Sequence, residues 1–373
     1  MKRILLITSV YTGAGHKSIS DALVEQFSEM SGVQIKVVDG FEFLSRIGVL
    51  SSRLYGLVMR HIPALYNSGW RYTMKHPPSF SKSARLCLRR FTQCLRGFHP
   101  DLILTVHSFF NTVLTRMLDS LGLEIPVVVF QADLVNIHST WCNPRAYMTI
   151  CPTREAYDAS IRQGLSPEKL TVIGFPVRRR FCEAAGETDM RDDAPSRPLR
   201  CLLISGGEGS GSLEAYAESI FMNTDAELTV ICGRNGKLHD RLLKGLGVQY
   251  GGRIRVLGFV AALEQEMLRC DLLVTRGSPN TLYEAVAMAV PFIVAGPLPA
   301  QEKDNPRLME QNNLGVISRS PGDIPSLIRS LLDNNAERLR EIRASQRAFR
   351  NPGSARKIAE FVSELTEPLD YSI

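Results

Sequence analysis

The chain lacks the long apolar runs and paired cysteines that mark several common protein classes. No stretch of its 373 residues approaches the roughly 18 apolar residues that a membrane-spanning helix needs. An apolar run from Ile4 to Ile7 follows the basic start; it is too short for a signal peptide and is typical of a buried strand. The eight cysteines form no C-x-x-C pair, which argues against a zinc site or a disulfide framework. These absences predict a protein of the reducing cytoplasm.

Acidic residues are missing from one long segment. Residues 43–100 hold ten Lys and Arg residues and no Asp or Glu. The excess extends over residues 1–185, which carry 22 basic and 13 acidic side chains, whereas the remainder carries 22 and 25. Nucleic acid and anionic lipid are the usual partners of such a surface.

Near-continuous apolar runs alternate with helical patterns along the chain. Such runs are typical of parallel strands covered on both faces, and their rhythm predicts an α/β fold of two doubly wound domains that face each other across a cleft. Polar residues 186–198 are the expected linker between domains 1–185 and 199–373, and the last helix is a candidate to pack back on the first domain. The expected strands are Ile4–Thr8, Val33–Asp39, Asp101–Val106, Pro126–Ala132, Tyr147–Cys151, Leu170–Ile173, Arg200–Ser205, Leu228–Cys232, Ile254–Leu257, Leu272–Thr275 and Pro291–Ala295.

A glycine-rich loop follows the first strand of each domain, where doubly wound sheets bind their ligands. In the loop at residues 13–16 (GAGH), the glycines allow a tight turn, and His16 is suited to accept a proton near neutral pH. The loop at residues 205–211 (SGGEGSG) predicts a phosphate cradle. Neither loop has the complete spacing of a dinucleotide or triphosphatase motif. A plain strand-to-helix turn is the alternative interpretation for the first loop, and a flexible turn is the alternative for the second.

A third loop follows the strand that ends at Thr275 and leads into a helix expected to begin near Asn280 or Thr281. Either residue could cap that helix and leave backbone amides free for a phosphate. Glu284 lies one turn further on, where its carboxylate could accept two ribose hydroxyls. Favourable interaction with the helix dipole is an equally good explanation of this glutamate.

These loops and their flanking residues, in this order, resemble the monogalactosyldiacylglycerol synthase and processive diacylglycerol glucosyltransferase family. More distantly they are similar to the lipid-linked N-acetylglucosaminyltransferase of peptidoglycan synthesis, and the architecture implied is GT-B. The similar segments cover nearly the whole chain and are Gly13–His16, Asp133–Trp141, Gly174–Arg178, Gly206–Gly211, Gly258–Val260, Arg276–Ala285, Pro299–Glu302 and Asn305.

The resemblance implies an inverting glycosyltransferase that moves a hexose from a UDP-sugar to a lipid without a metal ion or another cofactor. His16, next to Gly15, would be the general base on the acceptor side, with Asp133 nearby. His107 follows the strand at 101–106 and is a second candidate for the base, although a buried, hydrogen-bonded histidine is an equal alternative. The donor would be bound by Gly206, Gly207, Glu208, Gly209, Ser210, Gly211, Phe259, Val260, Arg276, Gly277, Ser278, Pro279, Asn280, Thr281, Glu284, Gln301 and Glu302.

The basic segment 43–100 is the expected site of the acceptor and of an anionic membrane surface. Leu57 would share an apolar helix face with Leu65, flanked by Arg53 and Arg60, and Pro63 is expected to kink or end that helix. Trp70 belongs to a group of aromatics typical of membrane interfaces. A second helix would carry a stripe of cations opposite an apolar face. That stripe is Lys82, Arg85, Arg89 and Arg96.

Several alternatives remain open at this point. The two helices could be an ordinary soluble pair with a solvated basic face, and Trp141 could contact acceptor or lipid or lie in the core. Nucleic acid is not expected, because no nucleic-acid-binding signature is present. The acceptor could be diacylglycerol, a polyprenol-linked sugar or a secondary metabolite. A UDP-sugar 2-epimerase and a non-enzymatic nucleotide-sugar or lipid-binding protein are the other candidates. The expected location is the inner face of the cell membrane.

Overall fold

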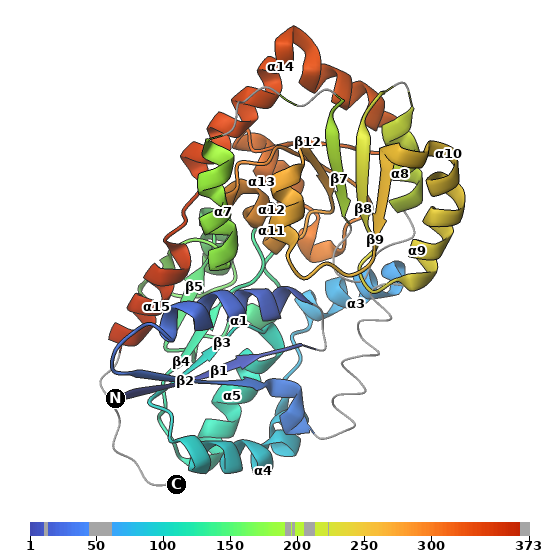
Figure 1. The fold of residues 1–373 in the computed structure, drawn as a ribbon. Helices are drawn as coiled ribbons and strands as arrows, with labels where there is room; N and C mark the ends of the chain where they lie inside the picture. Colours follow the sequence, from blue (N-terminus) through green and yellow to red (C-terminus); the bar gives the residue numbers. More distant parts are fainter. Residues whose placement is uncertain are drawn as a thin grey trace. The chain divides into compact units, whose positions relative to one another are not determined.

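The computed structural model describes residues 1–10, 14–44, 62–190, 195, 198–204, 213–222 and 224–365. The chain folds into two units, each with its own parallel sheet (Figure 1). The first unit comprises Met1–Arg178, Pro299–Gln301 and the segment from Gly353, and the second comprises Arg179–Leu298 and Glu302–Pro352. Among the described residues, no helix combines the length and the apolarity needed to cross a membrane.

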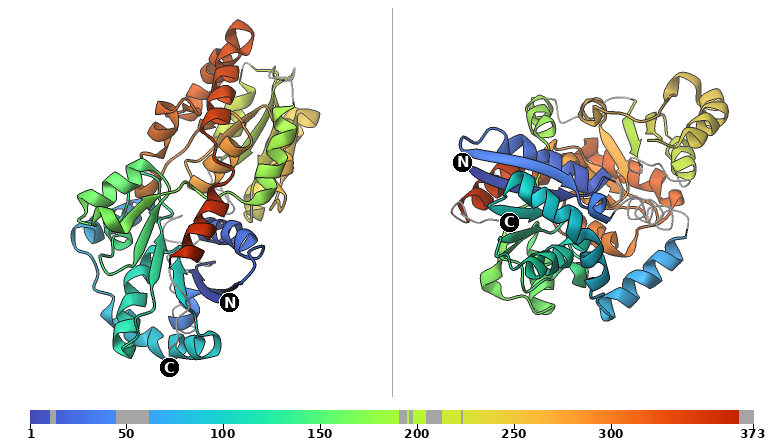
Figure 2. Two further views of the ribbon diagram at one scale, coloured as in Figure 1. Left: turned by 90° about the vertical axis from the view of Figure 1, so that its left-hand side faces the viewer. Right: turned by 90° about the horizontal axis from the view of Figure 1, so that it is seen from below.

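The first unit is built on a six-stranded parallel sheet in the order β2-β1-β3-β4-β5-β6. Its central strands are buried on both faces, as their unbroken apolar sequences predict. The helices α1 and α15 lie on one face and α4 and α5 on the other (Figures 1 and 2). The elements are β1 Lys2–Thr8, α1 Ala14–Phe27, β2 Val33–Asp39, η1 Gly40–Leu44, α3 Pro63–Lys75, α4 Ser81–Phe98, β3 Leu102–Thr105, α5 Ser108–Leu121, β4 Val127–Phe130, η2 Ser139–Trp141, β5 Met148–Cys151, α6 Arg154–Arg162, η3 Pro167–Lys169, β6 Leu170–Val172 and α15 Ser354–Glu364.

The second unit repeats this plan with the strand order β12-β11-β10-β7-β8-β9. Its core joins apolar side chains of the sheet to those of the helices α8 and α14. The elements are α7 Arg179–Asp189, β7 Arg200–Ile204, α8 Leu213–Phe221, β8 Glu227–Ile231, α9 Gly236–Leu242, η4 Leu243–Gly247, α10 Val248–Tyr250, η5 Gly251–Arg253, β9 Ile254–Leu257, α11 Leu263–Arg269, β10 Leu272–Thr275, α12 Pro279–Ala287, β11 Phe292–Val294, η6 Ala300–Glu302, α13 Asn305–Gln311, β12 Val316–Ile317, η7 Pro321–Asp323 and α14 Ile324–Phe349.

Every strand expected from the sequence is present, with ends that move by no more than two residues. The short strand β12 was not expected, because two residues carry no periodic signal. The division between the units falls between Arg178 and Arg179, earlier than the linker expected at 186–198, because helix α7 continues to Asp189. The C-terminal helix α15 groups with the first unit and packs on α1, and the Lys2 ammonium donates to the carbonyl of Ser363 at 2.6 Å.

Pro63 begins a helix, whereas the sequence pattern predicted that it would kink or end one. It occupies the first turn of α3, where its missing N–H has no helical partner to lose. The expected helix before it lies in residues 45–61, outside the described part of the chain. Leu65 is an exposed residue of α3.

Candidate functional site

The strand order of the first unit reverses between β1 and β3, so the connections that leave these two strands run in opposite directions. In doubly wound sheets, ligands bind beyond the carboxyl ends of the strands at such a point. Ile7 near the end of β1 lies opposite Thr105 at the end of β3. His16 follows β1 in the first turn of α1, and His107 follows β3. The topology thus brings the two predicted histidines to the same edge of the sheet.

The ring of His16 is held by the backbone of the neighbouring strand. Its Nδ1 lies 2.7 Å from the carbonyl oxygen of Val106. Because a carbonyl only accepts, Nδ1 carries the hydrogen and Nε2 keeps its lone pair. Burial lowers the pKa of His16 to about 4, against the opposing effect of the bond to Val106. The imidazole is therefore neutral at pH 7, with one nitrogen able to accept a proton.

His107 lies next to His16, with ring centroids 4.5 Å apart. It is the N-cap residue of α5, and its Nδ1 accepts the backbone N–H of Phe109 at 3.2 Å. This leaves the hydrogen on Nε2 of a neutral ring. Burial, followed by the proximity of His16, lowers the pKa of His107 well below its usual value. His107 thus has the hydrogen-bonding role opposite to that of His16 and is the poorer candidate for a base.

Trp141 connects the histidine pair to Asp133. Its indole ring centroid is 6.4 Å from that of His16, and its Nε1–H donates to Asp133 Oδ2 at 2.7 Å. Trp141 is only 2% exposed, as expected for the core interpretation of this residue. The indole thus links Asp133 to the surroundings of His16.

Two residues that the sequence did not single out hold the segment η2 that carries Trp141. Asn111 of α5 is fully buried, and its Nδ2 donates to the carbonyls of Thr140 at 3.1 Å and of Trp141 at 2.7 Å. His138 accepts the Thr140 N–H at Nδ1, while its Nε2 lies 3.0 Å from the hydroxyl of Thr73 on α3. The only available signal for Asn111 was a polar side chain in a largely apolar stretch after His107.

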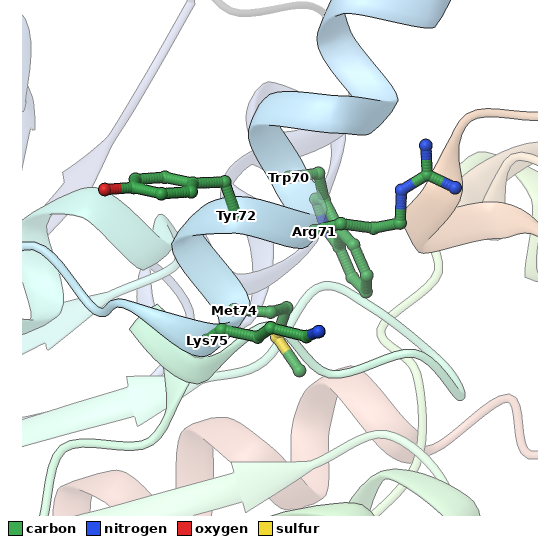
Figure 3. A pocket seen from close by; sticks show the side chains of 5 residues that line it. All are labelled: Trp70, Arg71, Tyr72, Met74 and Lys75. Carbon is green, nitrogen blue, oxygen red and sulfur yellow. The ribbon is translucent and has the colours of Figure 1, made fainter.

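Helix α3 lines the pocket of the first unit that Figure 3 shows. Tyr72 and Arg71 extend to opposite sides of the helix in that view. Trp70, an expected acceptor or membrane residue, lines the pocket and packs edge-to-face on His138 at 5.3 Å between ring centroids. The lining residues are Trp70, Arg71, Tyr72, Met74 and Lys75.

Helix α4 has the two faces that its sequence predicts. Its buried residues are Ala84, Cys87, Phe91 and Leu95. The predicted cations Lys82, Arg85, Arg89 and Arg96 are all exposed. Arg90 is turned towards η1, where its guanidinium donates to the carbonyl of Glu42 at 2.6 Å. Three further acceptor or membrane candidates, Arg53, Leu57 and Arg60, lie outside the described residues.

The second unit reverses its strand order between β7 and β10, with Ile204 opposite Thr275 at the strand ends. The expected phosphate loop follows Ile204 in the chain, but Gly206, Gly207, Glu208, Gly209, Ser210 and Gly211 lie outside the described residues. The other expected donor loop follows Thr275 at the same sheet edge. The two predicted phosphate loops thus leave neighbouring strands at a topological switch point.

Helix α12 begins at Pro279, one residue earlier than Asn280, the first of the two predicted starts. Ser278 is its N-cap residue, and proline at the first position needs no hydrogen-bond donor. Neither Asn280 nor Thr281 therefore caps the helix; both lie in its first turn. The preceding turn is held by Asn305, whose Nδ2 donates to the carbonyl of Gly277 at 2.8 Å.

Arg276 and Glu302 form an ion pair in the same region, with 3.2 Å between Nε and Oε2. Burial raises the pKa of the Glu302 carboxyl, and the guanidinium opposes that shift. Glu284 is 4% exposed on α12. Gln301 groups with the first unit, where its Oε1 accepts the Tyr66 hydroxyl at 2.8 Å. The sequence neighbours Gln301 and Glu302 are thus assigned to different units.

Phe259 and Val260 follow β9 at the carboxyl edge of the second sheet. Phe259 is 58% exposed, and the guanidinium of Arg234 lies 4.7 Å from its ring centroid. Arg234 follows the adjacent strand β8 and was not predicted as a site residue. In the sequence, Arg234 is a single cation after a predicted strand. Cations at such positions are too common for this one to be picked out as a site residue.

Comparison with known proteins finds relatives that match over nearly the whole chain. The family model described as monogalactosyldiacylglycerol (MGDG) synthase matches residues 16–177. The probable monogalactosyldiacylglycerol synthase of Nicotiana tabacum is 28% identical over 99% of this chain and 72% of its own length. Monogalactosyldiacylglycerol synthase 1 of Arabidopsis thaliana is 26% identical over 98% of this chain and 71% of its own length. The chain is a glycosyltransferase related to the monogalactosyldiacylglycerol synthases. The resemblance seen in the sequence is thereby confirmed.

Solved structures show the fold of this glycosyltransferase. MurG of Acinetobacter baumannii superposes with a TM-score of 0.65 at 15% identity, over 98% of this chain and all of the other. The MnaA–UDP complex of S. aureus superposes with a TM-score of 0.64 at 15% identity, over the whole of both chains. The predicted GT-B architecture and the predicted class, a UDP-sugar-dependent glycosyltransferase, are confirmed. The comparisons also support a lipid as the acceptor.

Proposed function

We propose that this glycosyltransferase transfers a hexose from a UDP-sugar to the free hydroxyl of diacylglycerol at an anionic membrane surface. The observation that carries the proposal is the position of His16 at the switch point of the first sheet, with Nδ1 bonded to Val106 and Nε2 left as a base. The similarity to proteins named monogalactosyldiacylglycerol synthases supports the lipid acceptor.

In the proposed reaction, the acceptor oxygen attacks the anomeric carbon of the sugar on the face opposite the diphosphate. The bond between that carbon and the diphosphate oxygen breaks, UDP leaves with the bonding electrons, and the acceptor proton passes to His16 Nε2. A ring with a pKa of about 4 is neutral before the reaction and takes the proton as the new bond forms. The neighbouring His107, with hydrogen on Nε2, is suited to orient the acceptor oxygen.

The donor is proposed to bind at the switch point of the second sheet. The amides at the start of α12 and the loop at 205–211 would hold the diphosphate. Arg276 would offset its charge, and Glu302 holds that guanidinium in place. Glu284 would accept the ribose hydroxyls. We propose that the charge of the diphosphate is stabilised without a metal ion or another cofactor.

The proposed membrane contact is the exposed surface of α3 and α4. Helix α4 presents the cations Lys82, Arg85 and Arg89, and each basic residue near an anionic lipid surface contributes about 1 kcal/mol. Helix α3 exposes Leu65 and Tyr72. Helix α3 also exposes its own cations Arg71 and Lys75, and a helix with exposed apolar, aromatic and basic side chains is typical of a protein that lies on a membrane without crossing it. We propose the cytoplasmic face of the cell membrane as its location.

A panel of UDP-glucose, UDP-galactose and UDP-N-acetylglucosamine against diacylglycerol vesicles, with products read by mass spectrometry, tests the function directly. We expect a monohexosyl diacylglycerol from one donor, together with stoichiometric UDP. A hexosylated polyprenol or soluble acceptor would replace the diacylglycerol assignment, and an epimerised free UDP-sugar would indicate a 2-epimerase. If titration calorimetry with UDP shows no binding, the proposal fails altogether.

A further inference from the structure

The loop that follows strand β11 is attached to helix α3 by two hydrogen bonds. The Tyr66 hydroxyl donates to Gln301 Oε1 at 2.8 Å, and the Ala300 N–H donates to Asn67 Oδ1 at 3.0 Å. One bond holds a side chain of the loop and the other holds the backbone next to it. The segment Pro299–Gln301 accordingly groups with the first unit, as α3 does.

Tyr66 lies on a different face of α3 from the exposed residues proposed to meet the membrane. Its side chain is 9% exposed, whereas that of its neighbour Leu65 is 57% exposed. A buried tyrosine hydroxyl usually has a hydrogen-bond partner, because a polar group removed from water without one costs free energy. Gln301 supplies such a partner. The same helix therefore exposes one face and uses another to hold the loop.

The next residue of the loop belongs to the proposed donor site of the second unit. Glu302 is buried and pairs with Arg276, with 3.2 Å between Nε and Oε2. The loop also leaves β11 at the carboxyl edge of the sheet, where doubly wound folds bind their ligands. Gln301 thus immediately precedes a carboxylate that is held beside the proposed diphosphate site.

The bond from Tyr66 decides which end of the Gln301 amide can bind a ligand. A glutamine amide has an oxygen that accepts and an NH2 group that donates. Because Oε1 accepts from Tyr66, the NH2 group is the end that can be presented to a ligand. The terminal torsion of a glutamine is broad and roughly two-fold, so without the tyrosine hydroxyl both orientations of the amide would be populated.

We propose that Tyr66 is a positioning residue for the donor sugar, which orients the Gln301 amide so that its NH2 group donates to a hydroxyl oxygen of the hexose. The inference rests on the proposed function, since it concerns the hexose of the same UDP-sugar. Asn67 acts together with Tyr66 by holding the loop backbone at Ala300. A loop already ordered on α3 loses less conformational entropy when the hexose binds.

Binding of UDP, UDP-glucose, UDP-galactose and UDP-N-acetylglucosamine to the full chain, measured by titration calorimetry, tests this assignment. For Tyr66→Phe we expect a roughly fivefold loss of affinity for the UDP-sugar that the wild type transfers, as for one lost hydrogen bond. The affinity for UDP, which has no hexose, should not change. Tyr147→Phe is the matched control, because it removes another tyrosine hydroxyl of the first unit, which donates to the Leu365 carbonyl at 3.3 Å. Its affinities should equal those of the wild type.

A double-mutant cycle with Gln301→Ala separates positioning from a general effect on the structure. Gln301→Ala should weaken the UDP-sugar and leave UDP unaffected, and the addition of Tyr66→Phe should then cause no further loss. Gln301→Glu keeps an acceptor for the Tyr66 hydroxyl but loses the NH2 group. It should therefore weaken the UDP-sugar at least as much as Tyr66→Phe does.

The assignment is overturned if Tyr66→Phe binds the UDP-sugar as the wild type does, or if its loss adds in full to that of Gln301→Ala. It is also overturned if Gln301→Ala binds the UDP-sugar normally, or if Tyr66→Phe weakens UDP and the UDP-sugar equally. Equal weakening would mean that the hydroxyl only supports the structure of the unit. If the wild type itself binds no UDP, the proposed function fails instead, so the two failures are distinguishable.

Discussion

His16 and His107 lie side by side, with 4.5 Å between ring centroids, but the backbone gives them opposite tautomers. The Val106 carbonyl places the hydrogen of His16 on Nδ1, whereas the Phe109 N–H leaves the hydrogen of His107 on Nε2. One ring of the pair is therefore a proton acceptor and the other a hydrogen-bond donor, and both are neutral at pH 7. The predictions on the first unit follow from this difference.

Replacement of His16 should affect turnover and leave donor binding intact. His16→Gln retains a polar side chain of similar size but cannot take up the acceptor proton, so kcat should fall by about two to four orders of magnitude. UDP affinity, measured by titration calorimetry, should stay near the wild-type value. A variant with normal kcat would exclude His16 as the base.

A pair of substitutions separates the two roles of His107, as the N-cap residue of α5 and as a ring beside His16. His107→Asn keeps an acceptor for the Phe109 N–H, because asparagine is a good N-cap residue, but removes the ring beside His16. His107→Ala removes both the cap and the ring, and should cost about 1 kcal/mol of stability in urea unfolding. We expect both variants to lose turnover and only His107→Ala to lose stability. Normal turnover in His107→Asn would show that the ring serves only as a cap.

The low pKa of His16 predicts a dependence of stability on pH. The unfolded ring titrates near its ordinary value of 6.5 and the folded ring near 4, so the unfolded chain binds more protons between these values. The stability that depends on the neutral, buried ring of His16 is fully present above pH 6.5 and is lost as the pH falls towards 4. The difference in unfolding free energy between the wild type and His16→Gln, measured in urea from pH 7.5 to 4.5, should shift against the wild type on acidification. A pH-independent difference would contradict the lowered pKa.

The contact between Trp141 and Asp133 predicts a positioning effect on catalysis. Trp141→Phe keeps an aromatic ring beside His16 but loses the N–H that bonds Asp133. Loss of a hydrogen bond to a charged group costs about 1.5–3 kcal/mol, so the variant should be less stable and should turn over more slowly. In a chain that still has Trp141, Asp133→Asn keeps an oxygen that can accept from the indole and should retain most of the wild-type stability. Equal stability of Trp141→Phe and the wild type would show that this bond contributes nothing.

The cations of α4 should control binding to anionic membranes. Reversal of Lys82, Arg85 and Arg89 to glutamate should abolish flotation with anionic vesicles at low salt, while binding of UDP remains unchanged. A variant with Lys244, Arg329 and Lys357 reversed makes the same change of net charge at exposed positions elsewhere and should float normally. Equal loss in both variants would mean that net charge alone, and not the α4 surface, drives the binding.

Much of the architecture could be predicted because apolar parallel strands leave a local signal. Runs such as Val127–Phe130 and Leu272–Thr275 are buried on both faces, and their sequences are correspondingly uniform. The ends of helices were harder to predict. Pro63 and Pro279 both begin helices, because a proline in the first turn is compatible with a helix that starts there as well as with one that has just ended.

The amino-acid sequence by itself determined the two α/β units, the position of His16 after the first strand and the basic face of α4, since each depends on residues close together in the chain. Only the tertiary structure decided which nitrogen of His16 is free, how Trp141 meets Asp133 and that Arg234 stacks on Phe259. These contacts join residues far apart in sequence, and no local pattern records which strand ends become neighbours in the folded sheet.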